Sequence, residues 1–148
     1  MKIEDEIKSN FRNEYHKLRV NLLLTTTRLG EKFQLMLKEF DLSPAQFNTL
    51  RILRGQNQQP ASIGLIKERM IDKSSDVSRI VDRLLKKKLI ARTENKIDRR
   101  QKDIVITKLG LELLSQIDKL EKKMDKSLLH LSESDAKQLN KLLDKLRS

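Results

Sequence analysis

The spacing of apolar residues changes abruptly in the middle of the chain, and this change limits the folds open to it. Over residues 77–85 apolar side chains recur at the three- and four-residue intervals of an amphipathic helix. Strand-forming residues follow over 89–93 and 103–107, separated by a charged turn over 94–100. The pattern predicts a helix followed directly by a β-hairpin. The apolar positions of the helix are Val77, Ile80, Val81, Leu84 and Leu85.

A long helix is predicted at each end of the chain. Apolar residues recur at intervals of three, four or seven from residue 3 to residue 39, which predicts one continuous helix. Gly30 lies inside it and lowers helix stability by ~1 kcal/mol relative to alanine, so it is expected to mark a bend or a close contact. Thr107 is predicted to begin a second long helix with heptad-like spacing, and Ser132 the last helix.

Three shorter helices are predicted between these ends. Ser43 is expected to cap the first, with Pro44 at its first position and Gln46 completing a capping box. Ser62 is expected to cap the second, and Ser74 to begin the helix that carries the 77–85 pattern. The predicted fold class is therefore mainly α: a winged helix-turn-helix lobe with long N- and C-terminal helices.

Composition removes several classes of protein. The 148 residues are enough for one domain, and the absence of cysteine excludes disulfides and thiolate metal sites. The chain has only two histidines, which argues against a zinc site. It also has no Ser-His-Asp set and no phosphate-binding glycine loop, so the sequence does not indicate an enzyme. No apolar run approaches the ~20 residues of a membrane span, and the charged N-terminus does not resemble a signal peptide. We expect a cytoplasmic, non-enzymatic protein without a cofactor.

Positive charge is concentrated in the predicted lobe. The chain carries a net charge of +11. Between Lys67 and Lys108 there are 14 Lys or Arg and seven Asp or Glu, and 14 minus seven leaves +7 in this segment. Nucleic acid is the first expected partner of such a segment, because neutralised phosphates release counterions, and an anionic membrane surface is the second.

The second helix of a winged helix-turn-helix lies in the major groove, where small or polar residues let the backbone approach the bases. The basic tip of the hairpin, or wing, can reach the minor groove, and Asp98 is expected to orient Arg99 or Arg100 by a charge-assisted hydrogen bond. Two structural alternatives remain: Ser74 acts only as a helix cap, and Arg79 and Arg83 pair with acids of their own helix. The candidate DNA-binding residues are Lys73, Ser74, Ser75, Ser78, Arg79, Arg83, Lys96, Arg99 and Arg100.

Three segments resemble the MarR family of bacterial transcriptional regulators. Asp98-Arg99-Arg100 and the segment Ile104-Val105-Ile106-Thr107-Lys108-Leu109-Gly110 resemble the family's wing. Residues 74–84 resemble its recognition helix, and residues 42–50 resemble the start of its second helix. The chain departs from the family at Lys88, where most members carry glycine, so this lysine must end a helix at positive φ.

The resemblance implies a homodimeric regulator, a repressor acting on a near-palindromic operator. Residues 1–39 and 108–148 would then form the dimerisation helices and residues 40–107 the DNA-binding lobe. Many members release DNA when a small aromatic or anionic ligand enters a cleft between the lobe and these helices. Tyr15, His16 and Phe47 are the candidate ligand-binding residues here.

Other functions remain open at this point. A helical protein-interaction module would use the terminal helices alone, but it leaves the basic wing unexplained. A non-specific DNA-binding protein would use the same charge without reading a sequence.

Overall fold

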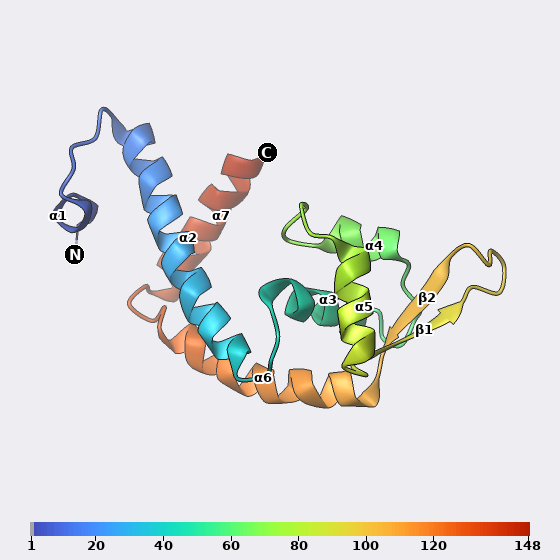
Figure 1. The fold of residues 1–148 in the computed structure, drawn as a ribbon. Coiled ribbons are helices and arrows are strands. Elements are labelled where there is room, and N and C mark those ends of the chain that lie inside the picture. The colour runs from blue at the N-terminus through green and yellow to red at the C-terminus, as the bar shows by residue number, and fades with distance from the viewer. Residues whose placement is uncertain (1) are drawn as a thin grey trace.

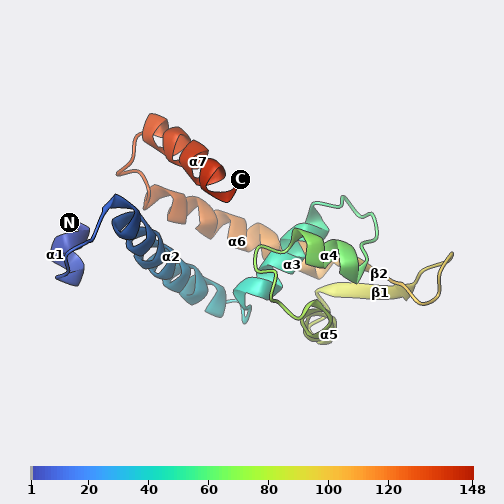
Figure 2. The same ribbon diagram turned by 90° about the horizontal axis from the view of Figure 1, so that it is seen from above.

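The computed structural model describes residues 2–148. Helices α3, α4 and α5 and the hairpin gather at one end, whereas α1, α7 and the first part of α2 lie at the other (Figures 1 and 2). This mainly helical fold with one two-stranded sheet confirms the predicted class. The elements are α1 (Ile3–Ile7), α2 (Glu14–Lys38), α3 (Pro44–Arg54), α4 (Ile63–Arg69), α5 (Val77–Lys86), β1 (Ile90–Glu94), β2 (Lys102–Ile106), α6 (Lys108–Lys126) and α7 (Glu133–Arg147).

One hydrophobic core holds the lobe together and reaches into the ends of the long helices. Apolar side chains of α3, α4, α5 and the hairpin meet the C-terminal end of α2 and the first half of α6. By contrast, α7 has no buried residue, and Leu37 is the buried residue of α2. Fully buried members of the core are Leu37, Leu50, Leu53, Ile66, Val81, Leu84, Ile104, Leu114 and Ile117.

Most helix starts follow the predicted caps. Ser43 Oγ accepts a hydrogen bond from the Gln46 amide at 3.2 Å, and Gln46 Oε1 accepts from the Ser43 amide at 3.1 Å, which confirms the capping box. The side chains of Ser62, Thr107 and Ser132 cap α4, α6 and α7, each by accepting a hydrogen bond from the backbone amide three residues on. Each of these caps satisfies an amide that the helix itself leaves without a partner.

The prediction of one helix over residues 3–39 was wrong. Helix α1 ends where Lys8 adopts a left-handed conformation with φ 49°, and α2 begins only after residue 13. Asn13 Oδ1 accepts a hydrogen bond from the His16 amide at 2.8 Å and so acts as the N-cap of α2. The side chain of Asn13 competes with the helical backbone for this amide, and here it starts a new helix.

The start assigned to the helix over 77–85 was also wrong. Helix α5 begins at Val77, and Asp76, not Ser74, caps it by accepting a hydrogen bond from the Arg79 amide at 3.1 Å. Ser74 belongs instead to a turn in which its hydroxyl donates to Asp72 Oδ1 at 2.6 Å. The Ser74 hydroxyl and the Asp76 carboxylate were both available as caps, and the path of the turn placed Asp76 at the start of the helix.

The hairpin and α6 meet in a crowded junction around Gly110. A Cβ atom at Gly110 would lie 2.3 Å from the carbonyl oxygen of Leu89 and 2.7 Å from Ile106 Cγ1. Lys88 has φ 59°, as expected for a residue that ends a helix where glycine is usual. The Thr107 hydroxyl donates to the Lys88 carbonyl at 2.8 Å, which joins α5, the hairpin and α6.

Gly30 behaves differently. A Cβ atom there would meet nothing within 4 Å, so the expectation of a close contact at Gly30 was wrong, and α2 continues through it.

No helix within residues 2–148 combines the length and apolarity needed to span a membrane.

Candidate nucleic-acid interface

Helix α5 buries one face and exposes the other. Val77, Val81 and Leu84 pack into the core, whereas Ser78, Arg79 and Arg83 are exposed. The acids expected as alternative partners are engaged elsewhere: the Asp76 carboxylate caps the helix, and Asp82 Oδ1 lies 3.2 Å from Arg92 Nη1. Within residues 2–148 neither Arg79 nor Arg83 lies at ion-pair distance from a carboxylate. Both guanidinium groups are therefore available to an external anion.

The loop before α5 is held in place by hydrogen bonds at two points. The Ile71 amide donates to Asn48 Oδ1 at 2.9 Å, which anchors the loop to α3. Farther along, the Ser74 hydroxyl and amide both donate to the Asp72 carboxylate and hold the pKa of Asp72 below its usual value. Lys73 Nζ donates to the Glu68 carbonyl. Lys73 and Ser74 are exposed and Ser75 is half-buried, so the loop presents them beside α5.

The wing is a regular antiparallel hairpin. Its register runs from Ile90 opposite Ile106 to Glu94 opposite Lys102. Lys102 Nζ lies 2.9 Å from Glu94 Oε1 and lowers the pKa of Glu94. Ala61 exchanges two backbone hydrogen bonds of 2.9 Å with Ile104, which ties the loop before α4 to the sheet. The sequence pattern did not predict this last contact, since a lone alanine carries no strand signal.

The tip of the wing is organised by two polar side chains. Asp98 Oδ1 accepts a hydrogen bond from the Arg100 amide at 3.0 Å. The predicted orienting role of Asp98 therefore acts on the backbone of Arg100, and no carboxylate of the described chain pairs with the guanidinium of Arg99 or Arg100. Asn95 Oδ1 accepts from the amides of Ile97 and Asp98, both at 2.9 Å. Sequence reasoning missed Asn95, although asparagine is a common turn residue.

Helix α5 and the wing form one surface. The Asp82–Arg92 ion pair joins the middle of α5 to β1, and Figure 2 shows α5 beside the strands. The structure brings all nine predicted DNA-binding residues to the loop before α5, to α5 itself or to the wing tip, and eight of them are exposed.

Phe47 borders a cavity of about 480 Å³ at the junction of α2, α3 and the loop before α5. We call it the Phe47 cavity. The rings of Phe33 and Phe47 meet edge to face at 5.3 Å, and the guanidinium carbon of Arg51 lies 5.8 Å from the Phe47 ring centroid. Arg51 Nη1 is 3.8 Å from Glu121 Oε1, a long ion pair. Asn48, Met70 and Ile71 also border the cavity.

The structure does not bring Tyr15 and His16 to Phe47. Along α2, the 18 residues from Tyr15 to Phe33, the neighbour of Phe47, span ~27 Å at 1.5 Å per residue. Tyr15 instead borders a hollow with Leu146 of α7, and His16 Nδ1 accepts from the Arg12 amide at 3.3 Å. The prediction of one ligand site from these three residues is corrected, because a long straight helix separates them.

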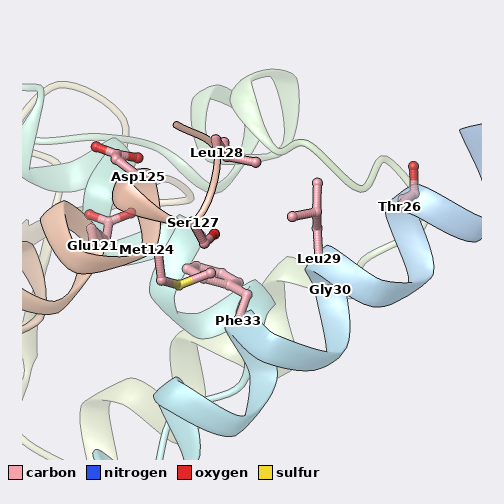
Figure 3. A pocket seen from close by; sticks show the side chains of 9 residues that line it. All are labelled: Thr26, Leu29, Gly30, Phe33, Glu121, Met124, Asp125, Ser127 and Leu128. Atoms are coloured by element: carbon pink, nitrogen blue, oxygen red, sulfur yellow. The ribbon is translucent and has the colours of Figure 1, made fainter. Parts of the chain in front are cut away.

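A second cavity of about 420 Å³ lies between α2 and α6 (Figure 3). Leu29, Gly30 and Phe33 border it from α2, and Met124 reaches toward the ring of Phe33. The carboxylates of Glu121 and Asp125 stand at its edge. Across residues 2–148, no group of three or more His, Cys, Asp or Glu could hold a metal ion.

A helix-turn-helix followed by a hairpin that is tied to its second helix defines the chain as a winged helix-turn-helix protein. Residues 42–102 match the model of the MarR family. The fold of the whole chain agrees with this match, since solved structures of MarR-family regulators superpose on nearly all of it. The chain therefore has a winged-helix fold, and its residues 42–102 match the MarR family.

Three similar structures illustrate the agreement. MepR from S. aureus in complex with DNA is 25% identical, with a TM-score of 0.78 over 93% of this chain and 97% of that one. BpsR from Bordetella bronchiseptica is 25% identical, with a TM-score of 0.73 over 88% and 99%. A mutant of E. coli MarR bound to operator DNA is 22% identical, with a TM-score of 0.80 over 93% and 99%. A comparison with curated protein sequences gives no match.

Proposed function

We propose that the protein is a homodimeric transcriptional regulator that binds a near-palindromic operator, represses transcription there and leaves the DNA when a small effector binds. The observation that carries this proposal is the surface formed by α5 and the wing. Five of its exposed cations have no acidic partner within the described chain: Arg79, Arg83, Lys96, Arg99 and Arg100. Structures of MepR and of a MarR mutant with DNA support the same partner for this fold.

Each part of this surface suits a different part of the duplex. The N-terminal half of α5 would enter the major groove, where Ser78 and Arg79 could reach base edges. Lys73 and Arg83 would contact phosphates on either side, and these contacts position the helix without reading sequence. Lys96, Arg99 and Arg100 would follow the minor groove. The net +7 of the segment from Lys67 to Lys108 supplies the long-range attraction.

The long helices support a homodimer. In α7, the side chains of Leu139, Leu142 and Leu146 are 44%, 56% and 57% exposed. In α2, Leu18 and Leu23 are 47% and 62% exposed. Contiguous exposed apolar residues mark association surfaces, and a second copy presents the same leucines in return. We assign residues 1–39 and 108–148 to dimerisation and residues 40–107 to DNA binding.

Selection of random duplex DNA on the purified protein, followed by sequencing, tests the proposal. We expect a two-fold symmetric motif whose half-sites lie about one helical turn apart, because each subunit of a dimer places one recognition helix in the major groove. Salt-sensitive binding without a motif would make the protein a non-specific DNA-binding protein. Weak binding with a flat salt dependence would favour a protein-interaction module and overturn the proposal.

The Phe47 cavity is the proposed effector site. Its aromatic walls and the Arg51 guanidinium suit a small aromatic anion, and the long Arg51–Glu121 pair leaves Arg51 able to turn toward a ligand. The same cavity touches Ile71, whose amide is anchored by Asn48 directly before the loop that leads to α5. A ligand there would press on the segment that positions Lys73 and Ser74. The BpsR structure concerns regulation of DNA binding by 6-hydroxynicotinic acid, which is an aromatic acid.

Arg51→Gln is expected to abolish release of operator DNA by aromatic carboxylates while leaving DNA affinity unchanged. Arg54→Gln is the matched control, because Arg54 lies on the same helix but is held by Asp118 in a bidentate pair of 2.8 and 3.1 Å. The measurement is fluorescence anisotropy of labelled operator during titration with substituted benzoates and 6-hydroxynicotinate. Equal loss of release in both variants, or no release from the native protein by any of these acids, would contradict this effector class.

A further inference from the structure

The apex of the wing carries an apolar side chain in full contact with solvent. Ile97 is 97% exposed, more than any other large apolar residue whose exposure the structure describes. It stands between Lys96 and Asp98, with Arg99 and Arg100 directly after, all of them exposed. Figure 2 shows this loop projecting beyond β1 and β2, away from the rest of the lobe. Nothing else in the lobe lies near enough to cover Ile97 within one chain.

The position of Ile97 is set by hydrogen bonds and not by packing. Asn95 Oδ1 accepts from the Ile97 and Asp98 amides, and Asn95 Nδ2 donates to Asp103 Oδ1 at 3.0 Å. The backbone amide of Asn95 donates to the backbone carbonyl of Gln101 at 3.1 Å. The backbone amide of Gln101 donates to the backbone carbonyl of Asp98 at 2.9 Å. The loop is therefore closed on itself with Ile97 held outward, although an isoleucine side chain is stabilised by removal from water.

We infer that Ile97 is a specificity-determining residue, an apolar contact with the floor of the minor groove that favours A·T over G·C pairs beneath the wing. This inference rests on the proposed function, since it requires a wing bound to DNA. Lys96 and Arg99 stand on either side of Ile97 in the sequence, so when these cations contact the phosphates that line the minor groove, the Ile97 side chain would face its floor. Other DNA-binding proteins also place apolar side chains in the minor groove, there as wedges between base steps.

The chemistry of the groove supplies the discrimination. An A·T pair presents only the N3 and O2 acceptors on the minor-groove floor, whereas a G·C pair adds the protruding N2 amino group of guanine. An isoleucine pressed against this amino group would remove its water and offer no acceptor in return, which is unfavourable. An asparagine at the same place could accept a hydrogen bond from this amino group through its side-chain oxygen, whereas an arginine carries only donors.

Base analogues test this inference without altering the major groove. In the selected operator, each adenine near the predicted wing position is replaced in turn by 2,6-diaminopurine, which adds only the minor-groove amino group. For the native protein we expect at least one such position to weaken binding by about fivefold or more. Changing the same pair to G·C should weaken binding similarly, and inosine in place of that guanine, which removes the amino group, should restore it.

The variants assign the effect to a side chain. Ile97→Ala should bind the unmodified and the diaminopurine operator with nearly equal affinity. Leu109→Ala, which removes an exposed leucine of α6 outside the wing, should keep the native ratio. If Ile97→Ala keeps the ratio and Arg99→Ala loses it, arginine reads the groove and the inference is overturned. Equal native affinity for all analogues overturns it too, while tight binding of the unmodified operator would leave the proposed function intact.

Discussion

Replacing Leu142 by glutamate is expected to convert the proposed dimer into a monomer and to lower operator affinity by about 100-fold or more. Leu142 lies on the exposed leucine face of α7 and is 56% exposed in a single chain. In the proposed dimer this face would be covered, so a carboxylate there would lose its hydration without gaining a partner. A monomer then binds one half-site at a time, and the second half-site no longer contributes.

Lys141→Glu is the matched control. Lys141 precedes Leu142 in sequence and lies on the opposite, charged side of α7, and its substitution changes the charge by two units instead of one. If repulsion from DNA were the cause, the control would have the larger effect. Light scattering gives the oligomeric state, and a titration at matched salt gives the affinity. A dimeric Leu142→Glu variant with native affinity would contradict the assignment of this face to dimerisation.

Gly110→Ala is expected to lower the free energy of unfolding by about 3 kcal/mol. The added Cβ would lie 2.3 Å from a backbone oxygen, that of Leu89, and this oxygen is held in place because it accepts a hydrogen bond of 3.0 Å from the Thr107 amide. The clash can therefore be relieved only by moving the start of α6 away from the wing. Such a shift should also reduce operator affinity in the fraction that remains folded.

Gly30→Ala is the control for this substitution. It introduces the same methyl group into helix α2, where no atom lies within 4 Å, and is expected to raise stability by ~1 kcal/mol through helix propensity. Denaturant unfolding at one fixed protein concentration measures both variants, since the stability of a dimer depends on concentration. Similar midpoints for the two variants would show that the junction around Gly110 tolerates a side chain.

Local signals of the sequence predicted most elements because the forces that form them act within a few residues. The capping box of Ser43 and Gln46 closes over three residues, and the β-branched residues that predict β2 lie within five. The two failures, at residues 8–13 and at Ser74, are also local, but in each case more than one nearby polar side chain could have capped the start of the helix. Only the direction of the chain beyond the turn selects among such alternatives.

Part of the candidate site could be predicted from local sequence signals, and part could not. The basic residues of α5 and the wing could be predicted, because they follow in sequence from a recognisable helix and hairpin. Asn95 and the Asp82–Arg92 pair were not, because their roles depend on residues that come close only after the hairpin folds back on α5. Tyr15, His16 and Phe47 were predicted as ligand-binding residues from their residue types. In the structure they do not form one site, because the length of α2 separates Tyr15 from Phe47.

The sequence by itself determined the order of helices and strands, the basic charge of the lobe and the match to a winged helix, since periodicity, capping and charge are properties of neighbouring residues. The tertiary structure decided which faces are buried, which cations stay unpaired and where cavities form. These depend on distances between segments far apart in the chain, such as Arg51 to Glu121 or Gly110 to Leu89. Such distances arise only when the core packs and brings those segments together.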